Sequence, residues 1–242
     1  MEDSSPAIGT TRRRWLLGLA VALSLVGHGA QADGGGSLYV YLPLDVSPRA
    51  LAKGLGASLP GVAITVFGRY KDFEKATEID HPDAVMSLRP VLEARNLRPA
   101  LQASIGGKAS ETYVAMTVGY LRTLSGKPIG AVDLMGRKDT ARFFAGFLSL
   151  KDPKVIWVTK TEDLLPLLQF QTAEAVLLPR RSVGSLKSKS SLDLTITDLV
   201  SFEVGLPALA FTGPGGSAIG DGVRRLPRDL NLLIGVDRWQ AE

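Results

Sequence analysis

Short apolar runs alternate along the first half of the chain with segments whose apolar residues recur every three or four positions. Three of the runs predict β-strands: 38–42, 62–67 and 84–86. The first helix is predicted after Ser47, a typical N-cap, and Pro48, a typical first helical residue. Two more helices are predicted at 69–79 and, with Ser87 as N-cap, through 88–94. The run 62–67 does not alternate, which predicts a strand buried on both faces.

The pattern changes after Pro99. Residues 101–105 alternate, Gly106 and Gly107 predict a turn, and 111–118 alternates again, so we expect an antiparallel pair. Beyond a break at 120–128, strands are predicted at 129–134, 155–158 and 175–178, and helices at 138–148 and 161–170. The remaining segments predict a solvated loop at 187–191, a strand that rejoins the first sheet at 208–211, and an irregular glycine-rich stretch at 213–222.

Strands and helices that alternate in this way predict an α/β protein with two lobes. Each lobe is expected to be a mainly parallel sheet flanked by helices, with hinge strands between the lobes. We assign 1–32 to a leader, 33–122 with 199–242 to the first lobe, and 123–198 to the second.

The first 32 residues read as an export signal. Arg12, Arg13 and Arg14 precede an uncharged run of 12 residues, 15–26, and Ala30–Ala32 is an A-x-A cleavage site. The run is shorter than the roughly 20 residues that span a membrane, so we expect cleavage after Ala32 and a periplasmic protein. The paired arginines resemble the twin-arginine export motif, and general secretion stays open as a route.

Composition excludes several classes of function. The chain has no cysteine, so no disulfide and no disulfide-linked partner is expected. A net charge of +4 is too balanced to predict nucleic-acid binding. Only His81 remains beyond the leader, so we expect neither a zinc site nor another cofactor, while a calcium site made of carboxylates alone stays open.

The second half carries a resemblance to a known family. Gly126 and Lys127 precede its first strand, and a leucine-rich helix precedes Glu174–Ala175 and a later strand. This order resembles the second lobe of type II periplasmic solute-binding proteins, in particular the phosphonate- and phosphate-binding members. The likeness covers roughly residues 37 to 212. It implies a protein that is not an enzyme, that captures a small anionic solute between its lobes, and that presents this solute to the membrane permease of an ABC transporter.

Candidate ligand-binding residues lie at predicted helix starts, where backbone N–H groups and the helix dipole attract anions. In the first lobe they are Asp45, Ser47, Ser87 and Arg89. In the second lobe they are Arg137, Lys138 and Thr140, with Arg180 and Arg181 after a later strand. For Asp45, Ser47 and Ser87 ordinary helix capping is the favoured explanation, since Ser and Asp are common N-caps with or without a ligand. Arg137 and Lys138 oppose the helix dipole, which favours an anion between them and the backbone. The turn 136–140 also departs from the Ser/Gly-rich ligand turn of the resembled family.

Two other functions stay open. The first is an envelope sensor or accessory protein on the same fold whose cleft has lost its ligand, which the short chain and the altered turn favour. The second is an exported hydrolase that uses His81, although no G-x-S-x-G or S-x-x-K motif is present. Residues 213–218 fit the form G-x-G-x-x-A, but Pro214 and the following glycines argue against the helix that a dinucleotide site requires.

Overall fold

The computed structural model describes residues 35–43, 46–148 and 153–242. The predicted leader, its cleavage site after Ala32, and the candidate ligand residue Asp45 lie outside these ranges. Within them, no helix is both long enough and apolar enough to cross a membrane.

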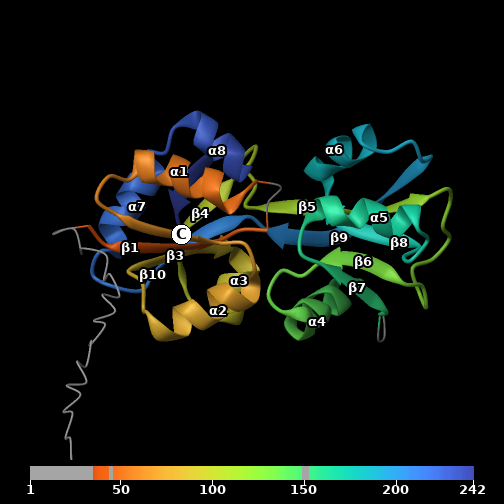
Figure 1. Cartoon of the computed structure of the whole chain (residues 1–242), viewed down its shortest axis with the longest axis horizontal. Coiled ribbons are helices and arrows are strands. Elements are labelled where there is room, and N and C mark those ends of the chain that lie inside the picture. The colour runs from red at the N-terminus through yellow and green to blue at the C-terminus, as the bar shows by residue number, and fades with distance from the viewer. Residues whose placement is uncertain (1–34, 44–45, 149–152) are drawn as a thin grey trace, which may run out of the picture. The chain divides into compact units, whose positions relative to one another are not determined.

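The first lobe is built on a six-stranded mixed sheet with the order β11-β4-β10-β3-β1-β2 (Figure 1). Its strands are β1 (Ser37–Tyr41), β2 (Ala63–Phe67), β3 (Ala84–Leu88), β4 (Pro99–Ser104), β10 (Pro207–Phe211) and β11 (Arg238–Ala241). β1 is parallel to β2 and β3, whereas β10 and β11 run antiparallel to their neighbours. One face carries α1 (Pro48–Ser58), α7 (Gly216–Arg224) and α8 (Arg228–Ile234), and the other carries α2 (Tyr70–Ile79) and α3 (Arg89–Ala94).

The second lobe is built on a five-stranded sheet with the order β7-β6-β8-β5-β9. Its strands are β5 (Ser110–Val118), β6 (Ile129–Val132), β7 (Val155–Val158), β8 (Ala175–Pro179) and β9 (Leu194–Gly205). β6 is parallel to β7 and β8, and β5 is antiparallel to β8 and β9. The helices are α4 (Arg137–Leu148), α5 (Leu164–Gln169) and α6 (Val183–Ser188), with 3₁₀ turns η1 (Thr161–Asp163) and η2 (Arg180–Ser182). The predicted two-lobe α/β architecture is confirmed.

The chain passes between the lobes at two short segments. Gly106 and Gly107 both have positive φ, and Ile105 and Lys108 exchange two backbone hydrogen bonds of 2.9 Å, so the predicted turn is present. The prediction that the strands on either side of this turn pair with each other is wrong, because β4 belongs to the first sheet and β5 to the second. The second crossing is Leu206, whose N–H donates to the carbonyl of Ala109 at 2.9 Å.

In this topology, two segments lie in a different lobe from the one to which we assigned them. We assigned 110–118 and 199–205 to the first lobe, yet β5 and β9 pair with each other in the second sheet. Local pattern predicts a strand, but the sheet that it joins depends on partners far away in sequence.

Other expectations fail for identifiable physical reasons. β2 is not buried on both faces, because it is the edge strand of its sheet. Ser87 does not cap α3: it lies within β3, and its hydroxyl donates to the carbonyl of Tyr41 at 2.6 Å. The predicted loop 187–191 begins later, because α6 continues through Ser188.

The glycine-rich stretch forms a helix, α7, where we expected irregular structure. The carboxylate of Asp83 accepts a hydrogen bond from the N–H of Gly215 at 2.9 Å, at the start of this helix. A Cβ at Gly213 or Gly216 would lie 2.7 Å from an oxygen of Asp83, so the glycines allow the helix to approach it closely. The reason given above against a dinucleotide site, the absence of a helix, is therefore wrong. The helix start is instead occupied by the protein's own carboxylate.

Candidate functional site

A cavity of 620 Å³ lies between the two lobes and is called the interlobe cavity below. The first lobe contributes Tyr41, Gly68, Arg69, Tyr70, Lys71 and Glu74, from the end of β1 and the β2–α2 turn. The second lobe contributes Asp133, Met135, Gly136, Arg137, Lys138, Asp139 and Thr159, from the β6–α4 turn and the end of β7. These are the carboxyl ends of parallel strands, where crevice ligands of open α/β sheets bind.

The charges of the cavity wall are not balanced. Arg69 pairs with Asp72 at 2.8 Å, Glu74 with Arg95 at 3.5 Å, and Asp139 with Arg142 at 3.2 Å. The three remaining cations, Lys71, Arg137 and Lys138, form no ion pair with any residue that the structure describes. Asp133 is the one lining acid without such a pair in the same described ranges. The wall therefore carries an excess of positive charge.

Two helices begin at this wall, one from each lobe. α2 starts at Tyr70 without a side-chain cap, and α4 starts at Arg137 after Gly136, whose φ is 86°. The N-terminal N–H groups of a helix lack intrahelical partners and carry the positive end of its dipole. An anion in the cavity would meet both helix starts and the unpaired cations together.

Thr140 has a structural role in place of the expected ligand contact. Its side chain is buried, and Oγ1 accepts hydrogen bonds from the N–H of Leu134 at 3.1 Å and of Met135 at 2.9 Å. The same hydroxyl donates to Oδ1 of Asp133 at 3.0 Å. Thr140 thus fixes the turn that places Arg137 and Lys138 on the cavity wall.

The other predicted site residues do not line the interlobe cavity. Ser47 is exposed and accepts a hydrogen bond from the N–H of Ala50 at 3.2 Å, as an N-cap. Ser87 is buried in β3, as described above. The guanidinium of Arg89 pairs with Glu93 and Glu242, each at 2.7 Å.

Arg180 and Arg181 also form ion pairs. Arg180 pairs with Asp198, and Arg181 pairs with Glu111 at 3.0 Å. Burial raises the pKa of Glu111, and the charge of Arg181 opposes this shift.

Arg181 also donates to the carbonyl of Gly235 at 2.8 Å, which joins the second lobe to the first. It lines a smaller interlobe cavity of 220 Å³ with Ser182. The structure therefore brings together Arg137 and Lys138, and separates both from Arg180 and Arg181.

The sequence reasoning missed the first-lobe half of the cavity wall. Gly68, Arg69, Tyr70 and Lys71 directly follow β2 and begin α2. The signal that could have found them is a strand-to-helix turn that contains two cations and lies at the carboxyl end of a parallel strand.

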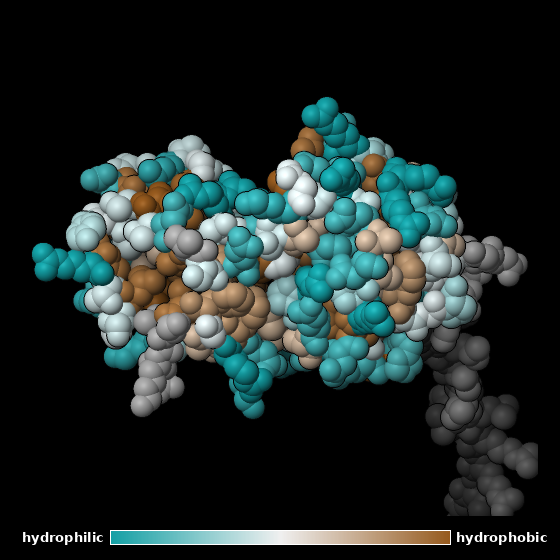
Figure 2. All heavy atoms as spheres, turned by 180° about the vertical axis from the view of Figure 1, so that it is seen from behind, coloured by the Kyte–Doolittle hydropathy of each residue, from teal (hydrophilic) through white to brown (hydrophobic). Residues whose placement is uncertain are grey.

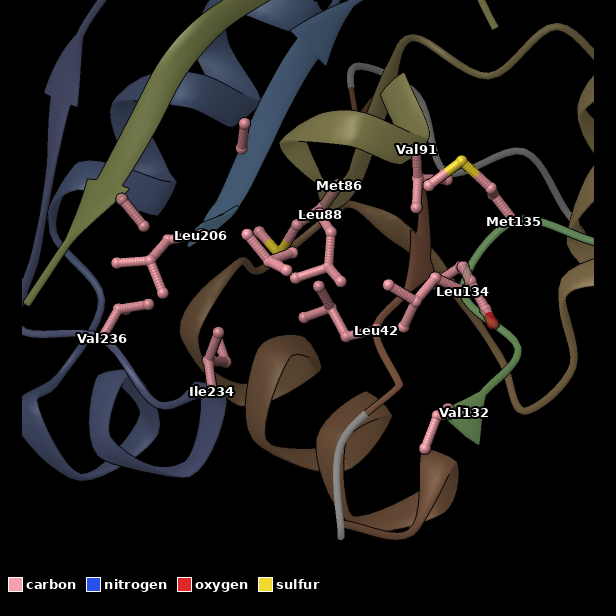
Figure 3. Close-up of a cluster of buried hydrophobic side chains, with 14 of the residues drawn as sticks. Leu42, Met86, Leu88, Val91, Val132, Leu134, Met135, Leu206, Ile234 and Val236 are labelled. Carbon is pink, nitrogen blue, oxygen red and sulfur yellow. The ribbon is translucent and has the colours of Figure 1, made fainter. Parts of the chain in front are cut away.

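The centre of the contact between the lobes is apolar. Five buried side chains meet there, and we call them the apolar clamp: Leu42, Leu88 and Val91 from the first lobe, and Leu134 and Met135 from the second. In Figure 3, Leu134 points toward Leu42, and Met135 points toward Val91. Burying a leucine or methionine side chain stabilises a protein by roughly 1.5–3 kcal/mol. The interlobe cavity therefore lies beside an apolar part of the contact between the lobes.

Two further contacts join the lobes at the cavity. The hydroxyl of Tyr41 donates to the backbone carbonyl of Asp133 at 3.1 Å, and burial raises the pKa of this tyrosine. The backbone of Gly136 packs against the ring of Tyr70, so that a Cβ at position 136 would lie 3.3 Å from Cε1.

Other features of the described surface have fewer groups that could bind a solute or a metal ion. A hollow of 380 Å³ in the second lobe is lined by Phe147 and Phe202 among other residues, and Figure 2 shows apolar residues gathered over this lobe at the left of the view. His81 is exposed in the turn before β3. Within the described ranges no group of three or more acidic or histidine side chains could hold a metal ion.

No protein-family model and no curated protein sequence matches the chain. Solved structures do match. The amino acid ABC transporter substrate-binding protein AbpA from Streptococcus pneumoniae, bound to L-arginine, has a TM-score of 0.53 at 17% identity, covering 82% of this chain and 93% of that one. The GluR0 ligand binding core in complex with L-glutamate has a TM-score of 0.54 at 14% identity, covering 83% and 96%. The periplasmic VFT2 domain of Bordetella pertussis BvgS has a TM-score of 0.53 at 13% identity, covering 82% and 92%.

This chain has the two-lobe fold of periplasmic binding proteins. At these identities the likeness concerns the fold, and the two matched structures with a named ligand hold amino acids. None of the three names a phosphonate or phosphate, so the phosphonate-binding branch of the resemblance receives no support from them.

Proposed function

We propose that the chain is an exported binding protein that holds a small solute with a carboxylate group in the interlobe cavity. The observation that carries this proposal is the set of three cations without ion partners among the described residues, Lys71, Arg137 and Lys138, at the starts of two helices from opposite lobes. Lysine and arginine donate charge-assisted hydrogen bonds to carboxylates and phosphates.

The solute class follows from the same wall. A carboxylate matches the three cations, and Asp133 offers an acidic partner for an amino group on the same solute. Amino acids combine both groups, and the two fold neighbours in complex with L-arginine and L-glutamate bind such molecules. We therefore place amino acids and small carboxylates first, with phosphate and phosphonates as further members of the test panel. A membrane permease that receives the solute is part of this proposal.

Export completes the proposal. The paired arginines, the uncharged run and the A-x-A triplet support removal of a leader after Ala32 and a periplasmic location. The intact mass of the protein recovered from the cell envelope tests this. A mass that includes residues 1–32 would contradict the proposed cleavage.

Binding is tested by thermal unfolding of the exported protein against a panel of amino acids, other carboxylates, phosphate and phosphonates. A ligand at 100 times its dissociation constant stabilises by about 2.7 kcal/mol, which corresponds to a rise in Tm of roughly 5–10 °C for a chain of this size. A panel in which no compound raises the Tm would contradict the proposal.

Calorimetry then locates the site. The double variant Arg137→Gln/Lys138→Gln should weaken binding of the compound found by about 30-fold or more, because each charge-assisted hydrogen bond contributes about 1.5–3 kcal/mol. The control Lys187→Gln/Lys189→Gln removes two exposed cations of the same lobe that do not line the cavity, and it should bind as the wild type does. Unchanged affinity in the first variant would move the site to Arg180 and Arg181.

A second candidate function is an envelope sensor or accessory protein that takes no solute. The apolar clamp favours it, because side chains of the chain itself fill the centre between the lobes. The thermal panel separates the two candidates, since only the first predicts a response to one class of compound.

A further inference from the structure

The apolar clamp lies between the hinge and the interlobe cavity. One hinge segment follows β4 and the other follows β9. In the first sheet, other strands lie between β4 and the strands that end at the cavity wall, β1 and β2. In the second sheet, other strands likewise lie between β9 and the strands that end at this wall, β6 and β7. Leu42 follows β1, Leu88 ends β3, and Leu134 and Met135 follow β6. A rotation about the hinge that widens the cavity would therefore have to separate the clamp.

The two second-lobe members of the clamp are almost completely buried. The exposed fractions are 1% for Leu134 and 3% for Met135, although both stand in a turn. On the first lobe Leu42 is 8% exposed, Leu88 4% and Val91 0%. Separating these surfaces would transfer apolar area into water, which is unfavourable in proportion to that area.

The turn that carries Leu134 and Met135 is held in place from both lobes. Within its own lobe, the hydroxyl of Thr140 binds the N–H groups of both residues. From the first lobe, Tyr41 binds the carbonyl of Asp133, immediately before the turn. On the side of the smaller cavity, Arg181 binds the carbonyl of Gly235 across the same interface.

We propose that Leu134 and Met135 hold the two lobes closed when no solute is bound. These side chains occupy the strand ends where an open α/β sheet would receive a ligand. The resting molecule is then already closed, and a solute reaches the interlobe cavity without a large rotation of the lobes. The proposal concerns the resting position of the lobes, and it holds whether or not the cavity binds a solute.

The test measures the distance between the lobes in the absence of any solute. Lys75 on α2 and Gly146 on α4 are exposed, and the chain has no natural cysteine, so Lys75→Cys/Gly146→Cys places one spin label on each lobe. Pulsed electron spin resonance should give one narrow distance distribution, and adding a solute from the panel should leave it unchanged.

The clamp is then weakened with Leu134→Ala/Met135→Ala in the labelled chain. We expect the distribution to broaden toward longer distances. The control Leu164→Ala removes a fully buried leucine from the second lobe outside the clamp, and it should lower the Tm while leaving the distribution narrow. Circular dichroism verifies that each variant is folded, and Leu42→Ala, which weakens the clamp from the first lobe, replaces the double variant if that one is not.

Two results would overturn the proposal. One is a broad or long distribution in the labelled chain that narrows only when a solute is added. The other is a folded clamp variant whose distribution matches that of the unmodified labelled chain.

Discussion

The hydroxyl of Tyr41, at the end of the first strand, donates a hydrogen bond to the backbone carbonyl of Asp133 in the opposite lobe, with 3.1 Å between the oxygens. The ring of Tyr41 stacks on Phe73, with centroids 5.4 Å apart, which fixes the direction of the hydroxyl. One side chain thus belongs to the first-lobe core, lines the interlobe cavity and crosses to the second lobe.

Replacing Tyr41 with phenylalanine keeps the ring and removes this bond. We expect the free energy of unfolding to fall by about 0.5–1.5 kcal/mol, the usual contribution of one hydrogen bond, measured from urea unfolding curves. The matched control is Tyr39→Phe, whose hydroxyl binds Asp80 within the first lobe at an exposed position. If the two variants lose equal stability, the hydrogen bond between the lobes stabilises the protein no more than an exposed hydrogen bond within one lobe.

Thr140→Val should destabilise more strongly. Valine has nearly the shape of threonine but leaves the buried N–H groups of Leu134 and Met135 without their acceptor, and each unsatisfied buried group costs roughly 1–3 kcal/mol. We expect a loss of about 2–4 kcal/mol in urea unfolding, and Thr140→Ser should restore most of it because the hydroxyl returns. A serine variant as unstable as the valine variant would show that the methyl group, and not the hydroxyl, fixes the turn.

Gly136 and Gly146 should respond in opposite directions to alanine. Gly136 has φ 86° and faces the ring of Tyr70, so Gly136→Ala should cost about 1–2 kcal/mol for the left-handed backbone alone. Gly146 lies within α4, the helix that begins directly after Gly136, and a Cβ at position 146 would have nothing within 4 Å, so Gly146→Ala should stabilise by up to about 1 kcal/mol. Thermal unfolding of the two single variants measures both signs, and a tolerated alanine at position 136 would contradict the packing described for the turn.

The sequence predicted those elements whose signals are local. Ser47 and Pro48 begin α1 as expected, and the hydrophobic runs of β1, β6 and β8 form strands. What failed depends on contacts distant in sequence. β5 joins the second sheet through β8 and β9, and the edge position of β2 follows from the order of the whole sheet.

In the candidate site, too, the predictions that rest on local signals succeeded and those that depend on burial failed. Arg137 and Lys138 were found because two cations at a helix start conflict with the helix dipole, and they line the cavity. Ser87 and Thr140 were chosen for the same kind of position, but the burial that turns their hydroxyls toward the backbone cannot be read from a serine or threonine alone. The first-lobe wall was missed although Arg69 and Lys71 also stand at a helix start, because the segment 69–79 was interpreted only as a helix and its cations were not compared with the dipole.

Asp83 provides a prediction about acid stability. Its carboxylate accepts hydrogen bonds from the N–H groups of Gly215 and Ser37, and these lower its pKa below the ordinary value of 3.8. A carboxyl group whose pKa is lowered by folding stabilises the protein above its unfolded pKa, and this contribution is lost as the pH falls through the folded value. Near neutral pH, Asp83→Asn should therefore cost about 0.5–1.5 kcal/mol, the usual contribution of one hydrogen bond, because the amide nitrogen of asparagine cannot accept a second N–H, and the difference from wild type should shrink below about pH 4. Urea unfolding across this range measures it, with Asp193→Asn, an exposed carboxylate, as the control. A difference that stays constant down to the lowest pH at which both proteins fold would mean that the charge of Asp83 does not stabilise the start of α7.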